Sequence, residues 1–497
     1  MLPALFNLAP EGPKDGTSTS ITSSYNPTFE ANPRLRATLT AILLVLLTPV
    51  SVLLTALAWV SGFGRPPKTP PNGKTVLVTG GKMTKSLHMA RWFWRSGYRV
   101  VMIETPKYWH VGARFSRSVA AFHVVPDPRL DPEGYVAGLV RVARLENAEY
   151  FVPVSSPAAA ISDAAAKEPL AAVGCSALHF DKPTCELLDN KHRFCEWARD
   201  ELGLNAPDTV LLHSNDDARK LNASLTAAAA AATDKTKLCR YILKNLEYDT
   251  QHRLDLFQLP CAPEALDAYL ATLTGPFALR ADTPWQAQRF LVGQEYTAFA
   301  VLREGTVRAL TVSTSSASQL NYVHVDMPEI EKWVVDFAAK THLTGMLCWD
   351  FIDDVVAKAP FPIECNPRVH SQSAVFLDDD AFGAAILAPT PPPAGTGTGD
   401  KGPRRPPRSA VPVFWLYNEV FKVLFPAHYG RAEGGLRGLF RTVTTQHDAQ
   451  LDGADPLPFI VANHVQMPML LAGNAWRGNP WKKCDFCIGK VVEVNGD

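Results

Sequence analysis

Two apolar strand patterns joined by a helical pattern restrict the fold of this chain more than any other feature. The segment TVLVTGGKMTKSLHMARWFWRSGYRVVMIET combines a strand pattern at residues 75–79, a Gly-Gly turn, a helical pattern at 84–95 and a second strand pattern at 99–103. Two strands joined by a crossover helix pair in parallel. The sequence therefore predicts an α/β domain with a mostly parallel sheet.

The glycines of this segment do not match a nucleotide-binding loop. A dinucleotide fingerprint needs three closely spaced glycines, and the next glycine after Gly81 is Gly97. The segment also lacks a Walker A loop, since Lys82 follows only a glycine pair. The next expected strand leads to Ser155 and Ser156, which are candidates for substrate binding or, equally, for capping the following helix.

The charge balance and the cysteines exclude some classes of protein. Lysines plus arginines equal aspartates plus glutamates at 49 each, so the bulk charge gives no support for a nucleic-acid partner. The 497 residues are enough for two to four domains. Nine scattered cysteines indicate reduced thiols in a cytosolic compartment. The single CxxC at Cys484 and Cys487 lacks the second pair of a zinc ribbon and is expected to be structural or incidental.

Residues 37–64 form an uncharged, apolar run long enough to exceed the hydrocarbon thickness of a membrane. Pro49 interrupts the run, and basic side chains flank it on both sides, so its orientation stays undecided. We therefore predict membrane attachment through a transmembrane or hairpin segment, with a buried core helix as the alternative. Residues 1–36, which are rich in Ser, Thr, Pro and Asn, are expected to be disordered.

Polar side chains interrupt two apolar strand patterns in the second half of the chain. In PFPIECNPRVHS, Glu364 and Asn366 are two positions apart and face the same side of a strand, while Asp350 stands alone among apolar residues in LCWDF. Such oxygen ligands suit Mg²⁺, and the guanidinium of Arg368 could then bridge phosphate groups. Alternatively, Asp350 bonds to the backbone and Glu364 pairs with Arg368.

The order Lys191, Lys244, QRFLVGQE, CWDF and IECNPR resembles the ATP-grasp superfamily. The resemblance implies a pre-ATP-grasp α/β domain followed by a two-lobed α+β fold that holds ATP between its lobes. It implies phosphate contacts from Lys191 and Lys244, an adenine-binding hinge, ribose binding, two Mg²⁺ ions and a catalytic Arg368 on the transferring phosphate. The residues implied for the hinge are Gln288, Arg289, Phe290 and Leu291; for ribose, Glu295; and for the metal ions, Asp350, Glu364 and Asn366. Many members have an acidic residue at the position of Arg289, so this departure bears on nucleotide preference.

A closer resemblance covers nearly the full length, apart from residues 1–33, the six consecutive alanines at 227–232 and residues 388–408. The motifs GGKMTK, ETPKYWHVGARFSRSV, IECNPRVHS, DPLPFIVANHVQMPMLL and DFCIGKVVEVNGD resemble the mycosporine-glycine synthase subgroup. That resemblance implies the ATP-dependent joining of glycine to 4-deoxygadusol, which gives mycosporine-glycine. The alternatives are an ATP-grasp carboxylate–amine ligase with another acid or amine, and a membrane-attached scaffold without catalysis.

Several further side chains are candidates with an equally simple structural explanation. His370 follows the proposed metal-binding strand and is expected to contact substrate or act as a base, or else to have a hydrogen-bonding structural role. Cys365 should face away from the metal as part of the core. The substrate candidates in KYWHVGARF are Trp109, His110 and Arg114, and the basic residues expected to form a solvated cluster are Arg404, Arg405 and Arg408.

These observations give a domain organisation that combines α/β and α+β architecture with an N-terminal membrane segment and a C-terminal extension. After the apolar run we expect a pre-ATP-grasp domain at 74–180, an ATP-grasp domain at 181–387, a flexible linker at 388–408 and an extension at 409–497. The catalytic domains are expected in the cytoplasm, attached to a membrane through residues 37–64. The extension is expected to cover the active site or to contact a neighbouring pathway enzyme.

Overall fold

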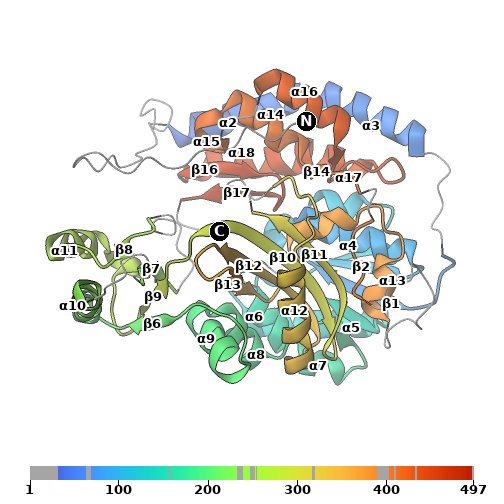
Figure 1. Cartoon of the computed structure of the whole chain (residues 1–497). Helices are drawn as coiled ribbons and strands as arrows, with labels where there is room; N and C mark the ends of the chain where they lie inside the picture. The colour runs from blue at the N-terminus through green and yellow to red at the C-terminus, as the bar shows by residue number, and fades with distance from the viewer. Residues whose placement is uncertain are drawn as a thin grey trace, which may run out of the picture.

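The computed structural model describes residues 32–62, 69–154, 156–157, 159–231, 239–246, 252, 255–315, 320–388, 402–407, 410–430 and 434–494. Strands in these residues form one five-stranded sheet, two four-stranded sheets and two two-stranded sheets. Figure 1 shows the five-stranded sheet and one four-stranded sheet in the body of the molecule, with the other four-stranded sheet projecting to one side.

The five-stranded sheet is parallel throughout, as the opening sequence pattern predicts. Its order is β3-β2-β1-β4-β5. The strands are β1 (Thr75–Thr79), β2 (Arg99–Glu104), β3 (Ala121–Val124), β4 (Tyr150–Val152) and β5 (Ser176–Ala177). The connecting helices are α4 (Thr84–Arg95), α5 (Pro132–Glu146), α6 (Ala160–Ala165) and α7 (Lys167–Ala171), with short 3₁₀ turns η1 (Pro106–Tyr108) and η2 (Gly112–Phe115). The predicted helix at 84–95 is confirmed as α4, which is buried over most of its length.

The projecting four-stranded sheet forms a small lobe with its own core. Its order is β6-β9-β7-β8, all antiparallel. The strands are β6 (Thr209–Leu212), β7 (Tyr241–Asn245), β8 (Gln258–Leu259) and β9 (Trp285–Arg289), with α10 (Asn215–Ala231), α11 (Pro263–Thr272) and η5 (Gly275–Phe277) beside them. Helices α8 (Lys182–Asp189), α9 (Lys191–Glu196) and η3 (Trp197–Glu201) lead into the lobe. Its core centres on Trp285, Leu212 and Leu243.

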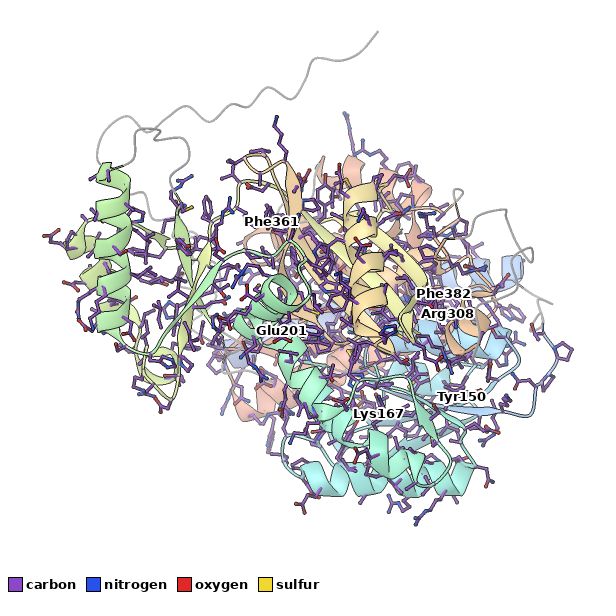
Figure 2. All side chains as sticks on the ribbon, turned by 60° about the horizontal axis from the view of Figure 1, so that its bottom comes forward. Tyr150, Lys167, Glu201, Arg308, Phe361 and Phe382 are labelled. Carbon is purple, nitrogen blue, oxygen red and sulfur yellow. The ribbon has the colours of Figure 1, made fainter. Side chains whose placement is uncertain are left out.

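The other four-stranded sheet is antiparallel in the order β11-β10-β12-β13. It consists of β10 (Gly293–Arg303), β11 (Thr306–Thr314), β12 (Gly345–Asp354) and β13 (Ala359–Asn366), and α12 (Pro328–Thr341) covers one face. Trp349 and Cys365 pack with α12 in one core cluster, so Cys365 faces away from Asp350 and Glu364, which stand on the opposite face. Figure 2 shows Phe361 on the side of this sheet that faces the small lobe.

The C-terminal segment packs directly against the first sheet and forms part of the same core cluster. Its elements are η6 (Ser371–Phe376), α13 (Phe382–Leu387), β14 (Val413–Phe414), α14 (Leu416–Leu424), α15 (Pro426–Tyr429), α16 (Gly435–Thr445), β15 (His447–Asp448), α17 (Leu457–Val461), η7 (Ala462–Gln466), α18 (Met467–Arg477), β16 (Trp481–Asp485) and β17 (Lys490–Glu493). Arg91 of α4 donates to Asp455 at 2.9 Å and is 3% exposed. The extension therefore completes the environment of α4.

The N-terminal apolar run is divided into two helices, α2 (Pro33–Leu46) and α3 (Thr48–Gly62). In the described residues no single helix is long and apolar enough to cross a membrane; the bent pair Pro33–Leu46 and Thr48–Val60 meets that requirement by length and composition only. The break lies at Leu47, two residues before Pro49, where the sequence predicts an interruption. The two helices are bent by 41° relative to each other, as in a broken span or a re-entrant loop.

Two arginines of the segment expected to be a flexible linker, Arg404 and Arg405, are exposed as predicted, but each also forms an ion pair with an acidic side chain. Arg404 pairs in parallel with Ala309 beside β11 and forms an ion pair with Asp379, whose side chain is 5% exposed. Arg405 pairs with Glu331 at 2.6 Å. A buried carboxylate such as Asp379 needs a charged partner, which explains why Arg404 docks. Residues 389–401 and Arg408 lie outside the described residues.

Candidate active site

Two carboxylates face each other on the open face of the large antiparallel sheet. Asp350 of β12 and Glu364 of β13 are direct partners in the strand register. On the other side of β12, Thr297 of β10 donates its hydroxyl to Asp350 Oδ1 at 2.9 Å. Burial, followed by the charge of Glu364, raises the pKa of Asp350 to about 7. A cation between the carboxylates would relieve both effects, so the pair fits the predicted Mg²⁺ site.

Asn366 and Arg368 extend this row of polar groups beyond the carboxylates. Asn366 lies two residues after Glu364 on the same face and is opposite Cys348 in the register. The guanidinium of Arg368 donates one N–H to Asn366 Oδ1 and another to Asp189 Oδ1, the latter at 2.9 Å. Since a carbonyl oxygen has two lone pairs, Asn366 retains acceptor capacity for a metal ion.

Two lysines from different elements approach the carboxylates. The Nζ atom of Lys191, at the start of α9, lies 3.5 Å from Glu364 Oε2. The Nζ atom of Lys244, on β7, donates to Gln288 Oε1 at 2.8 Å. Burial lowers the pKa of Lys244, and the charge of Glu364 opposes that shift. Two ammonium groups beside carboxylates give the mixed charge that a metal-bound polyphosphate requires.

The predicted adenine hinge connects β9 of the small lobe to β10 of the large sheet. The N–H groups of Arg289 and Phe290 donate to the carbonyls of Asp208 at 2.8 Å and Arg240 at 2.7 Å. Any hydrogen bond to adenine must therefore come from other backbone groups of this hinge. Gln288 Nε2 also donates to the carbonyl of Ile363 at 3.2 Å, which ties the two lobes together.

The remaining predicted nucleotide residues lie on the same connection. Leu291 is buried, at 5% exposure, and Glu295 is partly exposed on β10. The guanidinium of Arg289 lies 3.8 Å from Asp354 Oδ2, so the residue that departs from the ATP-grasp pattern has a structural partner. Glu295 contributes to the electrostatic environment of both Lys244 and Asp350. The structure thus gathers the predicted phosphate, metal and ribose residues between two lobes.

His370 caps the short helix η6 that follows the metal-binding strand. Its Nδ1 accepts a hydrogen bond from the Gln372 backbone N–H at 3.3 Å, and its ring contacts that of Tyr322 at a centroid distance of 5.5 Å. Burial lowers the pKa of His370 to about 3, and the charges of Lys85 and Arg368 add to the shift. The imidazole is therefore neutral with its proton on Nε2, which suits it to donate a hydrogen bond to substrate and not to act as a base.

Of the other substrate candidates, Arg114 and Ser156 have local hydrogen-bond partners. Arg114 donates to the carbonyl of Trp109 at 2.9 Å and lies over the ring of Phe122 at 5.0 Å. His110 is 7% exposed, and burial lowers its pKa. Ser156 accepts a backbone hydrogen bond from Ala159 at 3.0 Å just before α6. Ser155 lies outside the described residues.

A second group of metal-binding side-chain types consists of His324, Asp326 and Glu331, whose ligand atoms lie within 4.8 Å of one another. His324 Nδ1 contacts the hydroxyl of Thr311 at 3.2 Å, and Glu331 is occupied by Arg405. These existing partners explain the group without a metal ion.

Sequence reasoning missed several residues around the end of β13. Lys85 of α4 donates its ammonium to the carbonyl of Val369 at 2.5 Å. Cys487, at the end of the chain, donates its thiol to Ser371 at 3.0 Å. The loop after Arg368 is therefore contacted from both the N-terminal and the C-terminal parts of the chain. The motifs GGKMTK and DFC were visible in the sequence, but nothing in their spacing indicates that they meet.

No known family model matches the chain, and neither does any curated protein. Many chains of solved structures match at low identity. An L-amino acid ligase from Bacillus licheniformis is 16% identical, with a TM-score of 0.41, over 61% of this chain and 69% of that one. N5-carboxyaminoimidazole synthetase from Staphylococcus aureus is 16% identical, with a TM-score of 0.48, over 74% of this chain and 92% of that one. Phosphoribosylamine–glycine ligase from Thermotoga maritima is 14% identical, with a TM-score of 0.41, over 59% of this chain and 69% of that one.

At these identities and TM-scores the similarities settle neither the fold nor the reaction of this chain. The described site itself places oxygen ligands, two lysines and an arginine between two β-lobes.

Proposed function

We propose that this chain is an ATP-grasp ligase that uses Mg²⁺ and ATP to join an amine to an acid. The observation that carries the proposal is the opposed pair Asp350 and Glu364, with Lys191, Lys244 and Arg368 around it. Oxygen ligands beside several cationic groups suit a triphosphate with its metal ion, and they have no comparable use in a purely structural sheet.

The acid and the amine proposed are 4-deoxygadusol and glycine, with mycosporine-glycine as the product. The support is the resemblance of GGKMTK and IECNPRVHS to the mycosporine-glycine synthase subgroup. 4-Deoxygadusol is a vinylogous acid, whose oxygen would leave as hydroxide and is a poor leaving group. Phosphorylation converts that oxygen into part of phosphate, which leaves readily.

The proposed reaction balances in two steps. The enol oxygen takes the γ-phosphoryl group of ATP as the bond to the ADP oxygen breaks. The glycine nitrogen then bonds to the ring carbon, the carbon–oxygen bond breaks, phosphate departs with that oxygen, and the nitrogen releases a proton. The net products are mycosporine-glycine, ADP and phosphate.

Each side chain has a distinct part in this scheme. Lys191 and Lys244 hold phosphate oxygens, and Arg368 neutralises charge on the transferred group because its fork of donors suits phosphate. Asp350, Glu364 and Asn366 hold Mg²⁺, which when bound supplies charge neutralisation at the phosphates. His370, neutral with its proton on Nε2, donates to a substrate oxygen. Such phosphoryl transfer depends on positioning and electrostatics and needs no covalent nucleophile.

The decisive experiment is a reconstitution with purified protein, ATP, Mg²⁺, 4-deoxygadusol and a panel of amino acids that includes glycine. ADP release and the ultraviolet shift from 4-deoxygadusol to its amino-acid adduct are followed together. We expect both signals with glycine, and neither when the amine is omitted or when Glu364→Gln replaces the unmodified chain. Absence of ADP release with every acid and amine tested, by a folded protein, would refute the ligase.

We also propose that the N-terminal helices attach the protein to a membrane surface. Several polar residues of α2 and α3 face inward: Ser51 is fully buried and bonds to Tyr417 OH at 2.7 Å, and Thr40 is 5% exposed. Ala37 and Leu44 pack in the core, but most of the large apolar residues face outward, and Leu53 and Leu57 are each 60% exposed. This inverted pattern suits a lipid environment and not water.

A third helix supports the same surface. Leu436 and Phe440 of α16 are each 72% exposed, and Arg437 and Arg441 beside them are exposed as well. Helices α2, α3 and α16 lie along the same side of the molecule in Figure 1. Apolar and aromatic side chains flanked by arginines are typical of a helix at the interface of an anionic membrane.

A further inference from the structure

Lys85 is a buried ammonium group in the interior of the molecule. It lies near the start of α4, is 6% exposed, and donates to the carbonyl oxygen of Val369. Val369 directly follows Arg368, the proposed phosphate ligand, so Lys85 reaches the active-site loop from the first sheet. Burying an ammonium group costs free energy unless hydrogen bonds and an opposite charge compensate it.

In the part of the chain that is described, no carboxylate forms an ion pair with Lys85. Among the charged groups that act on Lys85, Arg368 has the largest effect, and its charge has the same sign. Asp485 also influences Lys85, but its Oδ1 accepts the N–H groups of Cys487 and Ile488 at 3.1 and 2.9 Å. A buried cation beside another cation, without an ion-pair partner in the described residues, is suited to bind an anion.

The groups around Lys85 come from three distant parts of the sequence. Tyr322 and His370 meet ring to ring, and Tyr322 is 6% exposed. Cys487 reaches Ser371 from the C-terminal hairpin, and its carbonyl accepts the N–H of Thr84, the neighbour of Lys85. Aromatic rings, a neutral imidazole and an ammonium group therefore stand together at the end of β13.

We propose that Lys85, Tyr322 and His370 form the acceptor site, in which Lys85 binds the anionic oxygen of a planar, cyclic vinylogous acid. This inference rests on the proposed ligase function and assigns its acceptor residues. Such an anion spreads its charge over two oxygens separated by the conjugated ring. One oxygen must face the phosphoryl group near Arg368, and Lys85 provides the cation for the other. The flat ring suits the aromatic side chains of Tyr322 and His370.

The test measures binding without turnover, by calorimetry with two probes of the same ring. Cyclohexane-1,3-dione is an anionic vinylogous acid at neutral pH, and its neutral enol ether 3-methoxycyclohex-2-en-1-one lacks the charge. The variants are Lys85→Gln, Lys85→Arg and, as a matched control, Lys82→Gln. Lys82 belongs to the same GGKMTK motif, but its ammonium lies 4.1 Å over the ring of Tyr108.

We expect the unmodified protein and Lys82→Gln to bind the anion at least tenfold more tightly than the enol ether. Lys85→Gln should lose that preference and Lys85→Arg should retain most of it, while all of them bind MgATP within twofold of one another. Equal preference for the anion in Lys85→Gln and the unmodified protein overturns the proposal. So does equal affinity of the unmodified protein for the two probes, a result that needs no variant to fold.

The two proposals fail in distinguishable ways. If the unmodified protein does not bind MgATP but prefers the anionic probe through Lys85, the ligase function is refuted and the anion site remains. If MgATP binds and glycine-dependent ADP release occurs without a role for Lys85 in probe binding, the ligase function stands and this acceptor site is refuted.

Discussion

Asp350 and Glu364 are direct partners across β12 and β13, so two carboxylates occupy one cross-strand position on the face that carries the site. Like charges placed directly opposite each other destabilise a sheet. The sheet keeps this repulsion at the point where the two proposed lobes of an ATP site meet. That cost is understandable if a cation resides there when the enzyme works.

Asp350→Asn should therefore stabilise the metal-free protein and abolish turnover. We expect the free energy of unfolding without Mg²⁺ to rise by up to about 1 kcal/mol, because the repulsion is removed. Mg²⁺ should raise the melting temperature of the unmodified protein and not that of the variant. Asp353→Asn, on the same strand but on its other face, is the control and should still respond to Mg²⁺. An unchanged Mg²⁺ response in Asp350→Asn would contradict the metal assignment.

Lys244→Met should weaken ATP binding while the small lobe stays folded. Lys244 is partly buried and desolvation lowers its pKa, so replacing the ammonium by an apolar group of similar length removes a costly charge from the lobe. Loss of a charged contact to phosphate should raise the dissociation constant for ATP roughly tenfold to a hundredfold, as calorimetry would measure. Lys220→Met, which removes an exposed lysine paired with Asp216 on α10, should leave ATP affinity unchanged.

Acceptor binding should decrease as the pH rises above 8. Burial, followed by the charge of Arg368, lowers the pKa of Lys85 to about 8, while Cys487, Cys348 and Asp485 oppose the shift. The ammonium is charged below that pH and neutral above it, whereas a vinylogous acid stays anionic throughout. The affinity for cyclohexane-1,3-dione should therefore fall progressively above pH 8, and that of Lys85→Arg should not.

The lowered pKa of Lys85 should make the free energy of unfolding increase with pH, whereas acceptor binding decreases. Between the folded pKa of about 8 and the usual lysine value of 10.5, the unfolded chain binds more protons at Lys85 than the folded chain does. The free energy of unfolding of the unmodified protein should accordingly rise with pH across this window relative to that of Lys85→Gln. A constant difference between the two proteins would show that Lys85 keeps an ordinary pKa.

The parallel sheet and helix α4, which connects its first two strands, could be predicted because they depend on local patterns. Apolar runs at 75–79 and 99–103 and the helical spacing at 84–95 are properties of adjacent residues, and all three elements are present. The cross-strand neighbours Asp350 and Glu364 could also be inferred, since each is an isolated acid in an apolar strand. In these cases short-range pattern and burial point to the same structure.

The surroundings of Lys85 could not be predicted, because they bring together residues that are far apart in sequence. Lys85, Met89 and Trp92 are spaced along one stripe of α4 and all are buried, so a charged residue on an apolar stripe was the only available signal. Which carbonyl receives its ammonium depends on where β13 ends and where the C-terminal hairpin docks. The docking of Arg404 on Asp379 was missed for the same reason, since a proline-rich composition does not reveal a distant buried acid.

Gly489→Ala should destabilise the protein more than Gly174→Ala, although both glycines have positive φ values of 68° and 82°. A Cβ at Gly489 would lie 2.0 Å from the carbonyl oxygen of Lys82, whereas a Cβ at Gly174 would have no atom within 4 Å. The free-energy cost of placing an alanine in the left-handed backbone region applies at both positions. The difference, about 1–3 kcal/mol in the free energy of unfolding, measures the contact of the C-terminal hairpin with the GGKMTK loop. If denaturant titrations give equal losses of unfolding free energy for the two variants, the C-terminal hairpin shifts to accommodate the added Cβ without a measurable cost.

The double variant Leu53→Asp with Leu57→Asp should release the protein from membranes without unfolding it. Both leucines are 60% exposed on α3, so the aspartates do not disturb the core but would have to enter the lipid interface. Each lost leucine contact and each added charge weakens partitioning, and together they should lower binding to vesicles of phosphatidylcholine and phosphatidylserine at least tenfold. Leu145→Asp is the control, because Leu145 is 66% exposed on α5, within the first domain. If the double variant sediments with vesicles as the unmodified chain does, the outward leucines of α3 do not contact lipid and the proposed membrane surface is wrong.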